Sequence, residues 1–98
     1  MKLQKLSSQL LKYMVECFHD NGKDAFNYTD FVNTFPDAKD HELKASLYKL
    51  EEDALVKINS YDNCPTFIFL KINTIVKIEE DTLIKKGYKI AKEIKSFL

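Results

Sequence analysis

Residues 40–58 of the chain read DHELKASLYKLEEDALVKI. The leucines at positions 43, 47 and 50 and the following Ala54 are separated by four, three and four residues. This spacing places the four side chains on one face of a helix, which we expect to span about residues 41–53. A short run rich in β-branched residues follows at once, from position 55. The sequence therefore predicts an α+β domain in which a docked central helix leads directly into a strand.

Two helices are predicted before this central helix. The first spans about residues 3–20, and its apolar stripe consists of Leu3, Leu6, Leu10, Met14, Cys17 and Phe18. Asn21-Gly22 should end it, because glycine readily adopts the left-handed conformation found at helix ends. A short strand is predicted at residues 25–28. The second helix, about residues 30–35, should be capped by Thr29 and stopped by Pro36, and Asp40 should cap the central helix.

Two strands are predicted after the central helix, with a turn over Asp62-Asn63-Cys64-Pro65 between them. The alternation of Ile72, Thr74, Val76 and Ile78 with other residues then predicts a third strand, with a loop as the alternative. The strand region would thus cover about residues 55–79. A last helix, about residues 82–97, should complete a single domain of residues 1–98.

Composition limits the function classes. The 98 residues carry fifteen basic and fifteen acidic side chains, and every basic residue apart from two histidines is a lysine. A protein held to nucleic acid by bulk charge alone should be more basic. The absence of arginine also removes the bidentate fork that most often recognises guanine.

Catalysis and metal binding find little support in the sequence. The two cysteines are far apart, and neither a Cys-x-x-Cys pair nor a histidine pair is present. We find no glycine-rich phosphate loop and no nucleophile elbow, so we expect neither an enzyme nor a cofactor. Without a signal peptide or a long apolar run, we expect a reduced, cytoplasmic protein that does not contact a membrane.

Two motifs resemble a known family. LKASLYKLEEDALVKI, residues 43–58, resembles the "L-x-x-x-L-x-x-L-E-x-x-G-L-I" junction of winged helix–turn–helix regulators of the MarR and PadR type. DTLIKKGYKIAKEI, residues 81–94, resembles the "L-T-x-x-G" segment that opens their last helix. The resemblance implies a three-helix core, a β-hairpin wing and a C-terminal helix. The composition would fit a phage or plasmid protein of a Gram-positive bacterium.

This resemblance implies that double-stranded DNA is the partner and that the central helix enters its major groove. With the leucines inward, one set of side chains faces outward from this helix and a second set lies on the wing. The DNA-binding residues predicted in this way are His41, Lys44, Ala45, Tyr48 and Lys49 on the helix and Lys57, Asn59 and Tyr61 on the wing.

The C-terminal segment is the basic part of the chain. Residues 71–98 hold seven lysines and four acidic residues, whereas residues 1–70 hold eight lysines and eleven acidic residues. The last helix also has a broad apolar face, and in similar regulators this helix pairs across a two-fold axis. The residues expected to form a homodimer are Ile84, Gly87, Ile90, Ala91 and Ile94. The alternative is that this face simply covers the first helix.

Two departures from the family pattern matter, one for the end of the central helix and one for DNA binding. Ala54 stands where the family has glycine, and a left-handed alanine costs about 1 kcal/mol or more, so we expect a differently built cap on Asp53. Acidic residues also flank the central helix at both ends, where they would face phosphates. The competing hypothesis is a protein–protein interaction module on the same fold, such as an adaptor or an antagonist of a host regulator.

Overall fold

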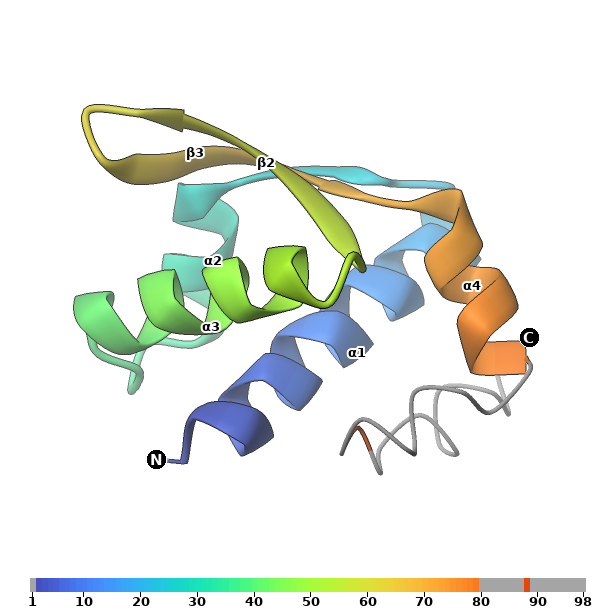
Figure 1. The fold of residues 1–98 in the computed structure, drawn as a ribbon, viewed down its shortest axis with the longest axis horizontal. Coiled ribbons are helices and arrows are strands. Elements are labelled where there is room, and N and C mark those ends of the chain that lie inside the picture. Colours follow the sequence, from blue (N-terminus) through green and yellow to red (C-terminus); the bar gives the residue numbers. More distant parts are fainter. Residues whose placement is uncertain (1, 80–87, 89–98) are drawn as a thin grey trace.

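The computed structural model describes residues 2–79 and Tyr88. This part of the chain forms an α+β domain of four helices and a three-stranded antiparallel sheet (Figure 1). The elements, in chain order, are α1 (Leu3–Asn21), β1 (Ala25–Asn27), α2 (Tyr28–Thr34), α3 (Asp40–Glu52), β2 (Val56–Tyr61), β3 (Cys64–Leu70) and α4 (Ile72–Glu79). Figure 1 shows α1, α2 and α3 beneath one face of the sheet, and the β2–β3 hairpin lies above α3. The C-terminal helix predicted over residues 82–97 lies outside the described residues.

The core forms where α1 and α3 pack together under the sheet. The predicted leucine stripe of α3 is confirmed, because Leu43, Leu47 and Leu50 are each at most 1% exposed. Burying a side chain of this size contributes about 1.5–3 kcal/mol, so the α1–α3 contact holds much of the fold. The remaining apolar core consists of Leu6, Leu10, Leu11, Met14, Val15, Phe26, Phe31, Leu55, Val56, Ile68, Leu70, Ile78 and Tyr88.

The sheet has the strand order β1-β3-β2, with β3 in the centre. Phe26 of β1 and Ile58 of β2 both pair with Ile68 of β3, so these three side chains share the face that covers the helices. The residues on either side of them in each strand therefore point to the opposite face. The strand predicted at residues 25–28 is confirmed, one residue shorter.

The hairpin turn is tighter than predicted. Asp62 and Asn63 have φ of 51° and 60°, so they alone form a two-residue turn of the kind that matches the twist of antiparallel strands. Cys64 and Pro65 belong to β3 instead. Proline has no N–H to donate to a neighbouring strand, so strands accept it mainly at irregular positions. Pro65 lies at such a position, because the register of β2 and β3 shifts between Asn59 and Ser60.

The end of α3 contains the left-handed residue that the sequence was expected to avoid. Asp53 is the C-cap residue with φ of −80°, and Ala54 follows with φ of 62°. The N–H of Leu55 donates to the carbonyl of Leu50 at 3.0 Å, and that of Ala54 donates to Glu51 at 2.9 Å. These two bonds form a Schellman motif, and the burial of Leu50 and Leu55 supplies its apolar contact. The expectation of a differently built cap is therefore wrong, because α3 ends in a left-handed residue that is alanine and not glycine.

The prediction of a third wing strand at residues 71–79 is wrong, because this segment forms α4. The residues that turn inward are Thr74, Ile75 and Ile78, whose spacing fits a helix as well as the alternation fits a strand. The Thr74 hydroxyl donates to the carbonyl of Leu55 at 2.6 Å and fixes this helix against the start of β2. Ile72, which is 74% exposed, is left outside the core.

Both predicted N-caps are also wrong. Asn27, not Thr29, caps α2, and it forms a reciprocal capping box with Asp30 in which both bonds measure 3.0 Å. Lys39, not Asp40, is the N-cap residue of α3, and its N–H donates to Glu42 at 2.9 Å. Asp40 is released from capping and binds other side chains.

Candidate functional site

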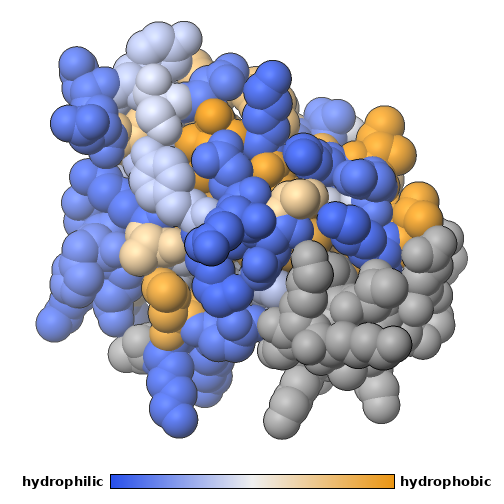
Figure 2. Space-filling model, viewed as in Figure 1, coloured by the Kyte–Doolittle hydropathy of each residue, from blue (hydrophilic) through white to orange (hydrophobic). Residues whose placement is uncertain are grey.

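The outward side of α3 and the hairpin are joined by a hydrogen bond. Opposite the leucine stripe, His41 and Ala45 are exposed and Tyr48 is half-buried. The hydroxyl groups of Tyr48 and Ser60 lie 2.8 Å apart, so the helix and strand β2 present one connected surface. We call His41, Lys44, Ala45 and Tyr48 the α3 face. Figure 2 shows that the molecular surface in front of α3 is mainly hydrophilic, with smaller apolar spots.

Lys44 is neutralised within its own helix. Its ammonium lies 2.9 Å from the carboxylate of Asp40, which also accepts a hydrogen bond of 2.5 Å from the Tyr28 hydroxyl. The bond from Tyr28, and then the one from Lys44, lower the pKa of Asp40. The same carboxylate raises the pKa of Lys44. Asp40 is therefore charged and already bound by Tyr28 and Lys44. Lys44 can bind a ligand only after its ion pair with Asp40 breaks.

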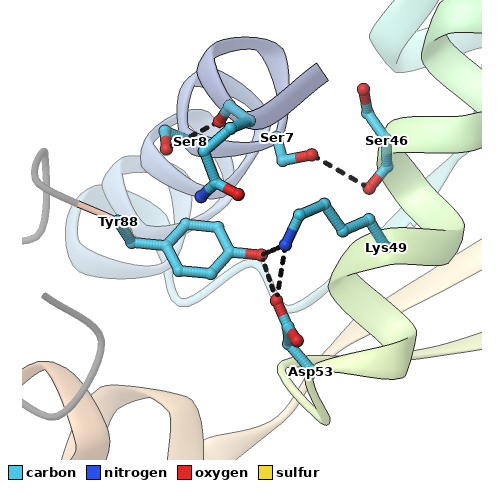
Figure 3. Close-up of polar contacts among 7 residues, drawn as sticks. Ser7, Ser8, Ser46, Lys49, Asp53 and Tyr88 are labelled. Atoms are coloured by element: carbon cyan, nitrogen blue, oxygen red, sulfur yellow. Dashed lines mark hydrogen bonds and ion pairs between the residues drawn. The ribbon is translucent and has the colours of Figure 1, made fainter. Parts of the chain in front are cut away.

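Lys49 is held more firmly, in a cluster that the sequence did not reveal (Figure 3). Its ammonium lies 2.9 Å from Asp53 and 3.4 Å from the Tyr88 hydroxyl, which itself donates to Asp53 at 2.7 Å. Burial, and then the bond to Asp53, raise the pKa of Tyr88. The spacing of Lys49 and Asp53 fits a helical ion pair, but nothing in the sequence links them to a tyrosine thirty-five residues further on. Lys49 thus ties residue 88 to α3.

Two acidic residues at the ends of α3 also have partners in the backbone. Glu42 accepts the N–H of Lys39, which lowers the pKa of the glutamate. Glu51 accepts the N–H of Ile58 on strand β2 at 2.7 Å. These carboxylates hold the start of α3 and the edge of the sheet, so a structural role accounts for part of the acidic charge.

The predicted wing residues do not share the side of the hairpin that meets α3. Lys57 pairs with Phe69 and Asn59 pairs with Phe67, so both lie on the sheet face turned away from the helices. The Tyr61 ring contacts the Phe67 ring at 6.3 Å on the same face. We call this surface the outer sheet face, and its residues are Ala25, Asn27, Lys57, Asn59, Tyr61, Phe67 and Phe69. The sequence did not single out its two phenylalanines, although their alternation with buried Ile68 and Leu70 was visible.

Two hollows lie beside α1. One of about 450 Å³ is lined by Leu3, Ala45, Tyr48, Lys49, Glu52 and Asp53, so three predicted DNA-binding residues surround it. The other, of about 510 Å³, lies between α1 and the turn after α2, and its lining includes Leu6, Tyr13, Phe35 and Pro36.

Comparisons with protein-family models, curated proteins and solved structures each found no match to this chain. Among residues 2–79 and Tyr88, no three metal-ligating side chains come together. Within the same residues, every helix is too short or too polar to span a membrane. The predicted dimerisation residues Ile84, Gly87, Ile90, Ala91 and Ile94 lie outside the described part of the chain, so the homodimer stays a prediction.

Proposed function

We propose that the protein is a winged-helix DNA-binding regulator in which α3 is the recognition helix and the β2–β3 hairpin is the wing. The observation that carries this proposal is the Tyr48–Ser60 hydrogen bond of 2.8 Å. It fixes an exposed helix face and a projecting hairpin as one surface, which is the arrangement that a major-groove reader with a flanking wing requires.

The N-terminal half of α3 would enter the major groove. Ala45 is small enough to allow close approach and to contact a thymine methyl group. Lys44 would exchange Asp40 for a phosphate or a guanine acceptor. The side chains of this ion pair are 34% and 66% exposed, and exposed ion pairs contribute little to stability, so the exchange costs little. Lys49 would support the surface through Tyr88 rather than contact DNA.

The test is binding to a random-sequence DNA duplex, measured by fluorescence anisotropy over a salt series. We expect the logarithm of the affinity to fall linearly with the logarithm of salt concentration, because each lysine–phosphate contact releases counterions. Lys44→Ala should lower the slope by about 1 if the contact is with phosphate.

Lys12→Ala is the matched control for this variant. Lys12 also forms an i,i+4 ion pair, with Glu16 on α1, and its side chain is equally exposed at 34%. The control should bind as the parent does. Parent protein that does not bind duplex at low salt would overturn the proposal, and a Lys44→Ala variant with parental affinity would remove α3 from the docking surface.

The second candidate is a protein-interaction module, and it is favoured by the ion pairs of Lys44 and Lys49 with Asp40 and Asp53. A helix face whose lysines are neutralised resembles a protein contact more than a polyanion contact. A protein that ignores duplex DNA but captures one defined partner through α3, with capture lost on substitution of Tyr48, would support this candidate.

A further inference from the structure

The outer sheet face exposes three aromatic rings. Tyr61 is 61% exposed, Phe67 is 44% exposed and Phe69 is 37% exposed. Two of these rings touch, since the centroids of Tyr61 and Phe67 lie 6.3 Å apart at an interplanar angle of 89°. Neighbouring aromatic groups left in water on a sheet are typical of a binding surface. In Figure 1 the described helices lie on the other face of the sheet.

The groups around these rings are amides and one cation. The register places Lys57 on one side of Phe69 and Ala25 on the other, and it places Asn59 and Asn27 on either side of Phe67. Lys57 is the one charged residue of the outer sheet face, and it forms no ion pair with residues 2–79 or Tyr88. Asp24 and Asp62 flank this face in the chain, directly before β1 and directly after β2. The charge of this surface therefore suits an anion.

The spacing of the rings suits a chain of bases. Phe67 and Phe69 are two residues apart on one strand, which corresponds to about 6.8 Å at a rise of about 3.4 Å per residue. That is about twice the 3.4 Å rise between successive bases of one nucleic-acid strand. An extended single strand can therefore place one base on each ring. A duplex cannot do so, because its bases are already stacked on one another.

We propose that the outer sheet face binds single-stranded nucleic acid. Tyr61, Phe67 and Phe69 stack on bases through their exposed rings, which tolerates any base because every base has a π face. Lys57 contacts the phosphate backbone beside Phe69. Asn59 offers its amide donor and acceptor to the edge of the base on Phe67, whereas the Asn27 amide oxygen already accepts the N–H of Asp30. This site is separate from the α3 face and does not depend on duplex recognition there.

The experiment compares binding of a fluorescent thymidine oligonucleotide and of a duplex to the same variants by anisotropy. Phe67→Thr and Phe69→Thr each introduce a β-branched residue, which sheets accommodate well, so the strand should persist. We expect each substitution to weaken single-strand binding about fivefold to a hundredfold and to leave duplex binding by α3 unchanged. Val32→Thr is the control, because Val32 is exposed to a similar extent, at 42%, but lies on α2.

The two proposals fail separately. Lys44→Ala should lower the affinity for duplex and leave the affinity for the single strand unchanged. A protein that loses only duplex binding therefore still supports a single-strand site on the outer sheet face. Parent protein that does not bind the oligonucleotide at low salt overturns the inference, as does full binding by the Phe67→Thr/Phe69→Thr double variant. A double variant that changes the molar mass in light scattering but not the single-strand affinity also overturns it, because the face would then join two copies of the chain.

Discussion

The α3 face and the outer sheet face use their lysines differently. On α3, Lys44 is bound by a carboxylate one helical turn away, at 2.9 Å. On the sheet, Lys57 lies on the edge strand β2, where its cross-strand partner is the uncharged Phe69. Helical spacing brings opposite charges together on one surface, whereas strand pairing surrounds a charge with whatever the neighbouring strands carry. On the α3 face, Lys44 must break an ion pair before it binds an anion. On the outer sheet face, Lys57 has no ion pair to break among the residues that the structure describes.

The largest effect should come from removing the support that both faces share. Leu47 is fully buried between α1 and the sheet, so Leu47→Ala should lower the free energy of unfolding by about 2–5 kcal/mol through lost burial and a cavity. Urea denaturation followed by circular dichroism measures this. Ala45→Ser on the exposed side of α3 is the control and should change stability by less than about 0.5 kcal/mol. A mild effect of Leu47→Ala would mean that the two faces do not share one core.

The next effect concerns the cluster behind the α3 face. Tyr88→Phe removes the hydroxyl that donates to Asp53 at 2.7 Å, and a hydrogen bond to a charged group contributes about 1.5–3 kcal/mol. We expect the unfolding free energy to fall by that order. Tyr13→Phe on α1 is a comparison substitution away from Asp53. Equal stability of Tyr88→Phe and the parent would show that residue 88 is not fixed to α3.

The same tyrosine predicts a pH dependence. Burial and Asp53 raise the pKa of Tyr88 in the folded protein, while an unfolded tyrosine titrates near pH 10, at about its ordinary pKa. A group with a raised folded pKa contributes stability that is present below its unfolded pKa and is lost as the pH rises toward its folded pKa. Unfolding free energies measured from neutral pH to above pH 10 should therefore decline, and Tyr88→Phe should make this decline shallower. An identical decline in the variant would assign it to other groups.

A smaller effect tests the junction between α3 and β2. Ala54 has φ of 62°, so Ala54→Gly should raise the unfolding free energy by about 1 kcal/mol. Gly22→Ala is the reciprocal control, because Gly22 has φ of 69° and a Cβ there would meet no atom within 4 Å. It should lower stability by a similar amount through backbone strain alone. Thermal melts measure the stability of both variants. A loss of stability in Ala54→Gly would contradict the left-handed conformation of residue 54.

The smallest effect sharpens the boundary between the two faces. Tyr48→Phe removes the hydroxyl contact with Ser60, which is exposed, so stability should fall by only about 0.5 kcal/mol, the lower end for a hydrogen bond. Duplex affinity should fall while single-strand affinity stays, because only the α3 face uses this link. Paired anisotropy titrations decide this, and equal loss of both affinities would show that the faces are mechanically coupled.

The sequence predicted correctly the helices that bury one face and expose the other. The stripes of α1 and α3 were recognisable because their apolar residues repeat at helical spacing and their opposite sides are polar. The segment of α4 was misassigned because its apolar residues are so frequent that both a strand and a helix bury some of them. The cap of α2 was misplaced because Asn27, Thr29 and Asp30 are all good caps, and only the reciprocal bond between the first and last of them selects one.

The candidate sites were predictable to different depths. The exposed residues of α3 followed from its leucines, and their ion pairs follow from helical spacing. The aromatic surface was not recognised because β3 is apolar on both faces, so the pattern does not tell which side meets water until the helices are placed. The contact of Lys49 and Asp53 with Tyr88 depends on tertiary packing across thirty-five positions, which local spacing does not encode.

The alanine at the end of α3 also provides a practical means of studying the molecule. Position 54 carries backbone strain at a place that belongs to neither proposed binding surface. A glycine background there would offset about 1 kcal/mol of damage introduced elsewhere. Substitutions on α3 or on the sheet that are too harmful to purify alone could then be compared at equal stability. Lost binding could thereby be separated from lost folding.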